Sequence, residues 1–136
     1  MGSLEGRKIL IVDDDRFIRS TIKLLLRAID HFVVAEADDG DVALVETDGF
    51  KPDVVLCDIT MPRMDGLQYI AQLRKHPDAR MRDRPVVILT EQAEESTVAD
   101  AVKPQVGGFL VKPVSAKALG GCLHRALDQR HAMAQG

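Results

Sequence analysis

The sequence predicts an α/β fold, a single doubly wound domain in which a five-stranded parallel sheet is flanked by five helices. Two observations lead to this fold class: five short apolar runs are typical of buried strands, and the segments between them have helical periodicity. A chain of 136 residues is the usual size of one such domain. The predicted strands are Lys8–Val12, Phe32–Ala35, Asp53–Cys57, Pro85–Leu89 and Gly108–Val111.

Between these strands, apolar side chains recur every three or four positions, as on the buried face of an amphipathic helix. The clearest case is Arg16–Asp30, where one stripe is formed by Ile18, Ile22, Leu25, Leu26 and Ile29. The other predicted helices are a short one at Asp41–Glu46, one at 67–74, one at Ala93–Val102 that ends before Pro104, and one that follows Ser115 as N-cap. The polar stretch His76–Arg84 is predicted to be the longest loop.

Composition excludes several classes of protein. The net charge is −3 and no lysine or arginine cluster stands out, so we expect no direct binding of nucleic acid. Cys57 and Cys122 lack the spacing of a disulfide framework, which indicates a reducing compartment. No apolar stretch approaches the roughly 18 residues of a membrane span, and no signal peptide is recognisable. We therefore expect a cytoplasmic protein without membrane contact.

Polar or charged residues end four of the five predicted strands. The unbroken apolar run Val54–Cys57 stops at Asp58, where a charge beside a core is costly unless it is paired or coordinated. The carboxyl ends of parallel strands meet at one edge of the sheet, where ligands bind. We therefore expect a site there. Its members at the strand ends are Asp13, Asp14, Asp15, Asp58, Thr90 and Lys112.

These residue types predict metal-assisted phosphoryl chemistry. Crowded carboxylates repel one another unless a cation binds, and an all-oxygen site with few carboxylates suits Mg²⁺. A carboxylate such as Asp58 can act as a nucleophile and form an aspartyl phosphate. Lys112 would supply positive charge, and the Thr90 hydroxyl could bond to a phosphoryl oxygen. Each residue also has a simpler interpretation: Asp13 and Asp14 as helix caps, Thr90 and Lys112 as surface or strand-end residues.

Four motifs resemble the receiver domain of two-component response regulators, the CheY-like family: IVDDD at 11–15, CDITMPRMDG at 57–66, VVILTE at 86–91 and FLVKP at 109–113. The resemblance covers residues 7–130 and implies a flavodoxin-like strand order of 2-1-3-4-5. Residues 1–6 would then be an N-terminal extension or a remnant of cloning, and residues 131–136 a C-terminal tail.

The resemblance also assigns roles to individual residues. Asp58 would be the phosphoryl acceptor. Thr90 and Lys112 would bind the phosphoryl group, and Thr90 and Phe109 would form the conformational switch. The implied Mg²⁺ ligands are Asp13 (largely through water), Asp14, Asp58 and the backbone carbonyl of Thr60.

The function implied by the resemblance is a phosphorylation-dependent signalling switch rather than an enzyme, although a receiver assists its own phosphorylation and dephosphorylation. A histidine kinase or a phosphotransfer protein would supply the phosphoryl group. A downstream protein would bind the face formed by the helix at 93–102, the strand Gly108–Val111 and the helix after Ser115. Two alternatives are a pseudo-receiver that is never phosphorylated and a metal-dependent phosphohydrolase. The phosphohydrolase would need a second carboxylate where this chain has Thr60.

The chain departs from the family pattern at two positions that should flank the phosphoryl group. Thr60 stands where the family often has asparagine, and Glu91 stands where it usually has a small residue. We expect both residues to tune the lifetime of the aspartyl phosphate. In addition, Lys103-Pro104 before Gly107-Gly108 should shorten or reshape the helix at 93–102.

Overall fold

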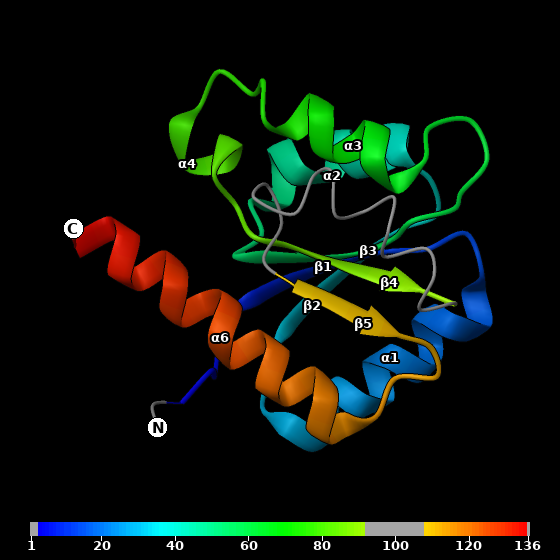
Figure 1. The fold of residues 1–136 in the computed structure, drawn as a ribbon, viewed down its shortest axis with the longest axis vertical. Helices are drawn as coiled ribbons and strands as arrows, with labels where there is room; N and C mark the ends of the chain where they lie inside the picture. The colour runs from blue at the N-terminus through cyan, green and yellow to red at the C-terminus, as the bar shows by residue number, and fades with distance from the viewer. Residues whose placement is uncertain (1–2, 92–107, 136) are drawn as a thin grey trace.

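The computed structural model describes residues 3–91 and 108–135, and its centre is a five-stranded parallel sheet (Figure 1). The strand order is β2-β1-β3-β4-β5, so the predicted fold class and order are confirmed. Two strands have the predicted bounds, and the other three begin one residue later. The strands are β1 (Lys8–Val12), β2 (Val33–Ala37), β3 (Val54–Asp58), β4 (Val86–Thr90) and β5 (Gly108–Val111).

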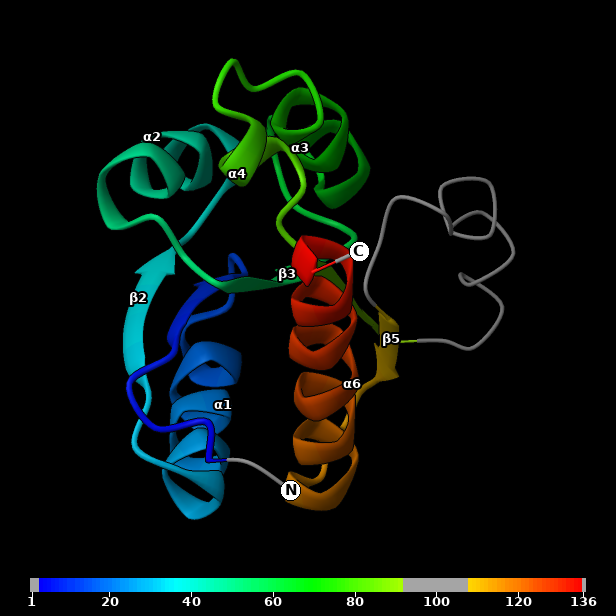
Figure 2. The same ribbon diagram turned by 90° about the vertical axis from the view of Figure 1, so that its left-hand side faces the viewer.

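Helices cover both faces of the sheet (Figure 2). Their bounds are α1 (Arg16–Ile29), α2 (Gly40–Phe50), α3 (Gly66–Leu73), α4 (Ala79–Arg82) and α6 (Ala116–Gln135). Helices α1 and α6 pack on one face, and α2 and α3 pack on the other. The helix predicted at Ala93–Val102 lies outside the described residues. None of the helices in the described ranges is long and apolar enough to cross a membrane.

The strands explain why the sequence contains unbroken apolar runs. In β1, Ile9 and Ile11 join the core beneath α1 and α6, while Leu10 and Val12 join the core beneath α2 and α3. Side chains on a strand alternate between the two faces, so a strand covered on both sides must be apolar at every position. The polar residue Asp58 at the end of β3 is therefore exceptional.

Helix α2 is longer than predicted, because the sequence alone suggested a short helix at Asp41–Glu46. The extension to Phe50 includes a residue with a tertiary contact, Thr47. The buried Thr47 hydroxyl lies 2.7 Å from the Ala43 carbonyl oxygen and 2.8 Å from the Tyr69 hydroxyl of α3. Lys51 then takes a left-handed conformation and ends the helix.

The stretch His76–Arg84, predicted to be a loop, contains the one-turn helix α4. The Asp78 side chain caps it by accepting from the Arg80 N–H at 2.9 Å, and Met81 is buried. Arg74 Nη1 donates to the carbonyl oxygens of Arg82 and Arg84 at 3.0 and 2.8 Å. Four residues are too few for a periodic pattern, so this turn could not be predicted from periodicity.

Residues 3–6 pack against the end of α1 and the residue that follows it. Leu4 is buried in the core beneath α1 and α6, and its N–H donates to Asp30 Oδ2 at 2.9 Å. The Gly6 N–H donates to the His31 carbonyl oxygen at 2.8 Å. This segment therefore contributes to the packed core, although the domain boundaries at 6 and 130 stay a prediction.

Candidate functional site

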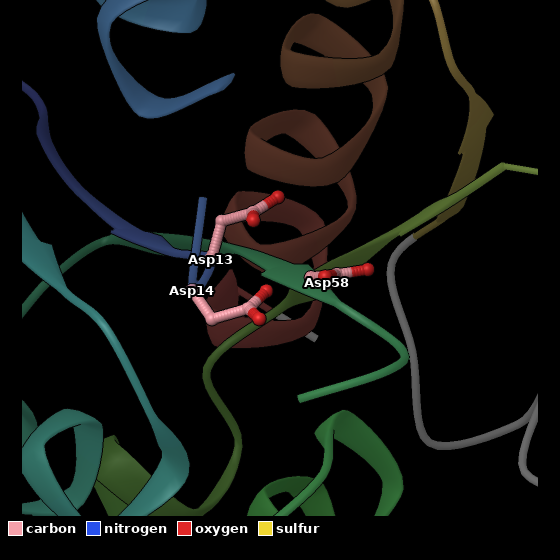
Figure 3. Close-up of side chains that lie close together, drawn as sticks. All are labelled: Asp13, Asp14 and Asp58. Atoms are coloured by element: carbon pink, nitrogen blue, oxygen red, sulfur yellow. The ribbon is translucent and has the colours of Figure 1, made fainter. Parts of the chain in front are cut away.

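Three carboxylates gather at the carboxyl edge of the sheet (Figure 3). Asp13 and Asp14 follow β1, and Asp58 is the last residue of the neighbouring strand β3. One carboxylate oxygen from each of the three lies within 4.8 Å of the others. Asp13 and Asp58 are only 0% and 6% exposed, whereas Asp14 is exposed. The predicted convergence of these residues is present in the fold.

The acidic loop after β1 is held by its own side chains and by β2. Asp15 is the N-cap of α1, because its Oδ1 accepts from the Phe17 N–H at 2.8 Å. Asp13 Oδ1 accepts from the Asp15 N–H at 2.9 Å, and the Asp13 N–H donates to the Ala37 carbonyl oxygen at 3.1 Å. The capping role that Asp13 or Asp14 could have had therefore belongs to Asp15.

Lys112 places an ammonium group between the two buried carboxylates. Its Nζ lies 2.9 Å from Asp13 Oδ2 and 3.5 Å from Asp58 Oδ1. The Lys112 N–H donates to the Thr90 carbonyl oxygen at 2.7 Å, which fixes the backbone beside β4, and the Lys112–Pro113 peptide is cis. Burial opposes the charged form, but the hydrogen bond that Lys112 donates to Asp13 and the charges of Asp13, Asp58 and Glu91 outweigh it and raise the Lys112 pKa.

Asp58 is the carboxylate whose ionisation is most strongly disfavoured by its surroundings. Burial and the negative charge of Asp13 raise its pKa from 3.8 to about 6, against the opposing effect of Lys112. The Thr60 N–H donates to Asp58 Oδ1 only at 3.4 Å, which is long for such a bond. Additional positive charge next to Asp58 would favour the ionised form of its carboxyl group.

The remaining predicted residues surround the same edge. Thr60 is exposed two residues after Asp58, and Thr90 is 1% exposed at the end of β4. Glu91 is exposed, and its charge reaches Lys112. Phe109 is partly buried against the core beneath α2 and α3, beside Ile88 of β4. Their placement is compatible with the expected roles, which stay predictions.

The donor set fits the Mg²⁺ that the family resemblance implies. Three carboxylates on two adjacent strands offer hard oxygen ligands, and the exposure of Asp14 leaves one side open to water. The pKa of Asp58, raised first by burial and then by the charge of Asp13, agrees with this, because a divalent cation would offset the repulsion between the two carboxylates. A cavity of about 620 Å³ between α1 and β2 lies apart from these carboxylates, and its lining includes Lys23, Arg27 and Glu36.

Contacts around the β3–α3 connection were missed by reasoning from the sequence. A Cβ on Gly66 would lie 2.3 Å from the Asp58 carbonyl oxygen, so only glycine allows α3 to begin this close to the predicted acceptor. Arg63 forms an ion pair with the buried Asp39, the N-cap of α2. No local pattern in the sequence links Asp39 to Arg63.

Comparison with known proteins identifies the family. The family model for the response regulator receiver domain matches residues 9–123. The chain therefore belongs to the receiver domains of two-component response regulators. Receiver domains are signalling modules, and the acidic cluster of Asp13, Asp14 and Asp58 agrees with this assignment.

Individual relatives support the assignment. The chain is 41% identical to chemotaxis protein CheY of Listeria monocytogenes over 120 residues, which are 88% of this chain and 97% of that protein. It is 36% identical to the transcriptional regulatory protein YdfI of Bacillus subtilis over 114 residues, 82% of this chain but 51% of that protein. The solved structure of Vibrio cholerae chemotaxis protein CheY4 superposes with a TM-score of 0.77 at 30% identity, covering 90% and 99% of the two chains.

Proposed function

We propose that this receiver domain is switched by phosphorylation of Asp58, with Mg²⁺ as cofactor. One observation carries the proposal: a buried carboxylate ends β3 within reach of two further carboxylates and 3.5 Å from a lysine ammonium. A nucleophile, a cation site and a positive charge for the phosphoryl oxygens thus occupy one pocket. A histidine kinase or a phosphotransfer protein would be the donor.

The proposed transfer is a displacement at phosphorus. An Asp58 carboxylate oxygen forms the new O–P bond while the donor's P–N bond breaks, and the imidazole nitrogen leaves with the electron pair and takes a proton from solvent. Asp13, Asp14, Asp58 and the Thr60 carbonyl would hold Mg²⁺. Bound there, Mg²⁺ would neutralise negative charge and orient the phosphoryl group.

Lys112 and Thr90 would receive the phosphoryl oxygens. Lys112 already lies near Asp58. Once Mg²⁺ neutralised the Asp13 carboxylate, the Lys112 ammonium could move from Asp13 to the phosphoryl group. The Thr90 hydroxyl would follow, and Phe109 would pack differently in the space that Thr90 leaves. This local rearrangement would alter the face around β5 to which a downstream protein binds.

Two alternative functions are less consistent with the residues present. A pseudo-receiver typically lacks a member of the acidic pair, the acceptor or the lysine, and this pocket contains Asp13, Asp14, Asp58 and Lys112 together. A phosphohydrolase needs a second carboxylate near its nucleophile as acid and base, where this chain has the exposed Thr60.

The test is labelling with acetyl phosphate and Mg²⁺, read by intact mass. Wild type should gain one phosphoryl group, and Asp58→Asn should gain none because the amide is not a nucleophile. Asp15→Asn is the matched control, because asparagine keeps the cap of α1 and the pocket loses no predicted ligand. Equal labelling of wild type and Asp58→Asn would refute the assignment, as would a wild type that is never labelled.

A further inference from the structure

The connection between β3 and α3, residues 59–65, is tied to the start of α2 by one ion pair. Arg63 Nη2 donates to Asp39 Oδ2. The other oxygen, Asp39 Oδ1, accepts from the Val42 N–H at 2.8 Å and caps α2. The Asp39 side chain is 2% exposed, whereas that of Arg63 is 71% exposed. The exposed Arg63 side chain is therefore bound to a buried carboxylate whose position is fixed by the cap of α2.

The backbone at Arg63 gives a second reason to assign the pair a role. Its φ is 65°, in the left-handed region that residues other than glycine or asparagine adopt uncommonly. Arginine has no conformational advantage at such a position. The contact with Asp39 is the interaction that an arginine side chain can make there and a glycine cannot.

The neighbouring contacts transmit this restraint to the phosphorylation pocket. A Cβ on Gly40 would lie 2.6 to 2.8 Å from three atoms of Met64, so the start of α2 touches the connection directly. At its other end, Gly66 abuts the Asp58 carbonyl oxygen. A movement of the connection relative to α2 would therefore move the backbone around Asp58 and Thr60.

Asp39 also lies close to the loop after β1 that carries Asp13. The Asp13 N–H donates to the carbonyl oxygen of Ala37, two residues before Asp39. Strand β1 lies between β2 and β3 in the sheet. The backbone of Asp13 is thus hydrogen-bonded to the end of the outer strand β2, and the Asp39–Arg63 pair joins the segment that follows β2 to the connection that follows Asp58.

We propose that this ion pair, called here the Asp39–Arg63 latch, is a positioning device that holds the Asp58 and Thr60 segment in register with Asp13 for Mg²⁺ binding. The inference rests on the proposed function for its metal, but its structural part concerns the metal-free protein. Neither residue touches the reacting atoms. Groups that orient metal ligands from outside commonly change metal affinity by about tenfold or more when they are removed.

The variants separate positioning from folding. Arg63→Asn keeps a residue that tolerates the left-handed backbone but removes the charge, and Asp39→Asn keeps the cap of α2 but weakens the pair. Arg63→Lys restores the charge and should recover part of the effect. Arg80→Asn is the control, because Arg80 of α4 is also an exposed arginine beside an N-cap aspartate, Asp78, at 3.8 Å, but that aspartate is itself partly exposed.

Two measurements test the latch in the full chain: Mg²⁺ affinity by calorimetry, and hydrogen exchange of amides 59–66 in EDTA. Arg63→Asn and Asp39→Asn should each weaken Mg²⁺ binding by about tenfold. The double variant should be no weaker than the single variants, because both remove the same pair. Exchange at 60–64 should accelerate by a similar factor. The melting temperature should change by about 2 °C or less, since the arginine is exposed.

Several results would overturn the proposal. Unchanged exchange at 59–66 in both variants would do so, and so would additive losses in the double variant or a loss of affinity that merely follows a lower melting temperature. If wild type bound no Mg²⁺, the proposed function would fail, and exchange in the metal-free protein would still decide whether the pair holds the connection.

Discussion

Two buried carboxylates at the same edge of the sheet, Asp58 at the end of β3 and Asp39 at the start of α2, have pKa values that are shifted in opposite directions. The pKa of Asp39 is lowered, mainly by the hydrogen bond from the Val42 N–H and also by the charge of Arg63. The pKa of Asp58 is raised to about 6, mainly by burial and the charge of Asp13. Their exposures are 1% and 6%, so burial alone does not explain the difference.

The difference lies in the donors that each carboxylate receives. Each oxygen of Asp39 accepts from a donor of its own. Asp58 Oδ1 has the Thr60 N–H at 3.4 Å and shares Lys112 with Asp13. A carboxylate whose two oxygens both accept hydrogen bonds has a structural role. A buried carboxylate with too few donors keeps its affinity for a cation. The contrast distinguishes an aspartate with a structural role from the aspartate that is the proposed phosphoryl acceptor, at the same edge of the sheet.

The largest expected effect is the change in the free energy of unfolding when Asp58 is substituted. The rise of its pKa from 3.8 to about 6 corresponds to about 3 kcal/mol of destabilisation in the ionised protein. Because the folded state binds the proton more tightly, stability falls as pH rises from about 4 to about 6 and stays low above that range. Asp58→Asn should therefore stabilise the metal-free protein by up to about 3 kcal/mol at pH 8.

Urea unfolding in EDTA checks this prediction. The gain from Asp58→Asn should shrink as the pH is lowered toward 4, and loss of the Lys112 contact should offset part of it. Asp15→Asn is the control, since it changes a neighbouring aspartate that serves as a cap. Equal stability of wild type and Asp58→Asn at pH 8 would mean that the pocket tolerates the charge and would remove the contrast with Asp39.

Substitution of Asp39 should change stability in the opposite direction, that is, lower it. Asp39→Ala removes the cap of α2 and leaves Arg63 without its partner, so the melting temperature should fall by about 4 °C. Asp39→Asn should lose much less, because asparagine caps helices about as well as aspartate. Thermal unfolding at pH 7 measures both. A stabilised Asp39→Ala would show that Asp39, too, is a strained carboxylate.

The smallest expected effect concerns Glu91, a further carboxylate, which lies beside the pocket. We predict that its side chain obstructs the water that attacks the aspartyl phosphate, so Glu91→Ala should lose its label about threefold faster than wild type. The measurement is single-turnover loss of label from purified phosphoprotein at fixed Mg²⁺.

Glu91→Gln separates size from charge, because the charge of Glu91 acts on Lys112. If obstruction decides the lifetime, the glutamine variant should decay like wild type. Decay that is unchanged or slower in Glu91→Ala would contradict obstruction. A glutamine variant that decays like the alanine variant would assign the effect to charge.

Much of the fold was predictable because local patterns determine it. Strands β1 and β5 have the predicted bounds, since a short apolar run that ends at a polar residue marks a strand. Ser115 was predicted to cap the last helix, and its Oγ accepts from the Ala118 N–H at 3.1 Å. The true length of α2 was not predictable, because its last turns include Thr47, whose partner Tyr69 belongs to another helix.

The groups that reach the carboxyl edge could be predicted from the chain alone, because strand-end residues of a parallel sheet must meet there: Asp13, Asp14, Asp58, Thr90 and Lys112 all do. The partners that each group finds there depend on how the segments pack in space. Asp15 rather than Asp13 or Asp14 caps α1, and Lys112 lies closer to Asp13 than to Asp58. Asp39 and Arg63 pair across 24 residues of sequence. Hydrogen bonds and charges act over a few ångströms of space, and no local pattern encodes distances between segments far apart in the chain.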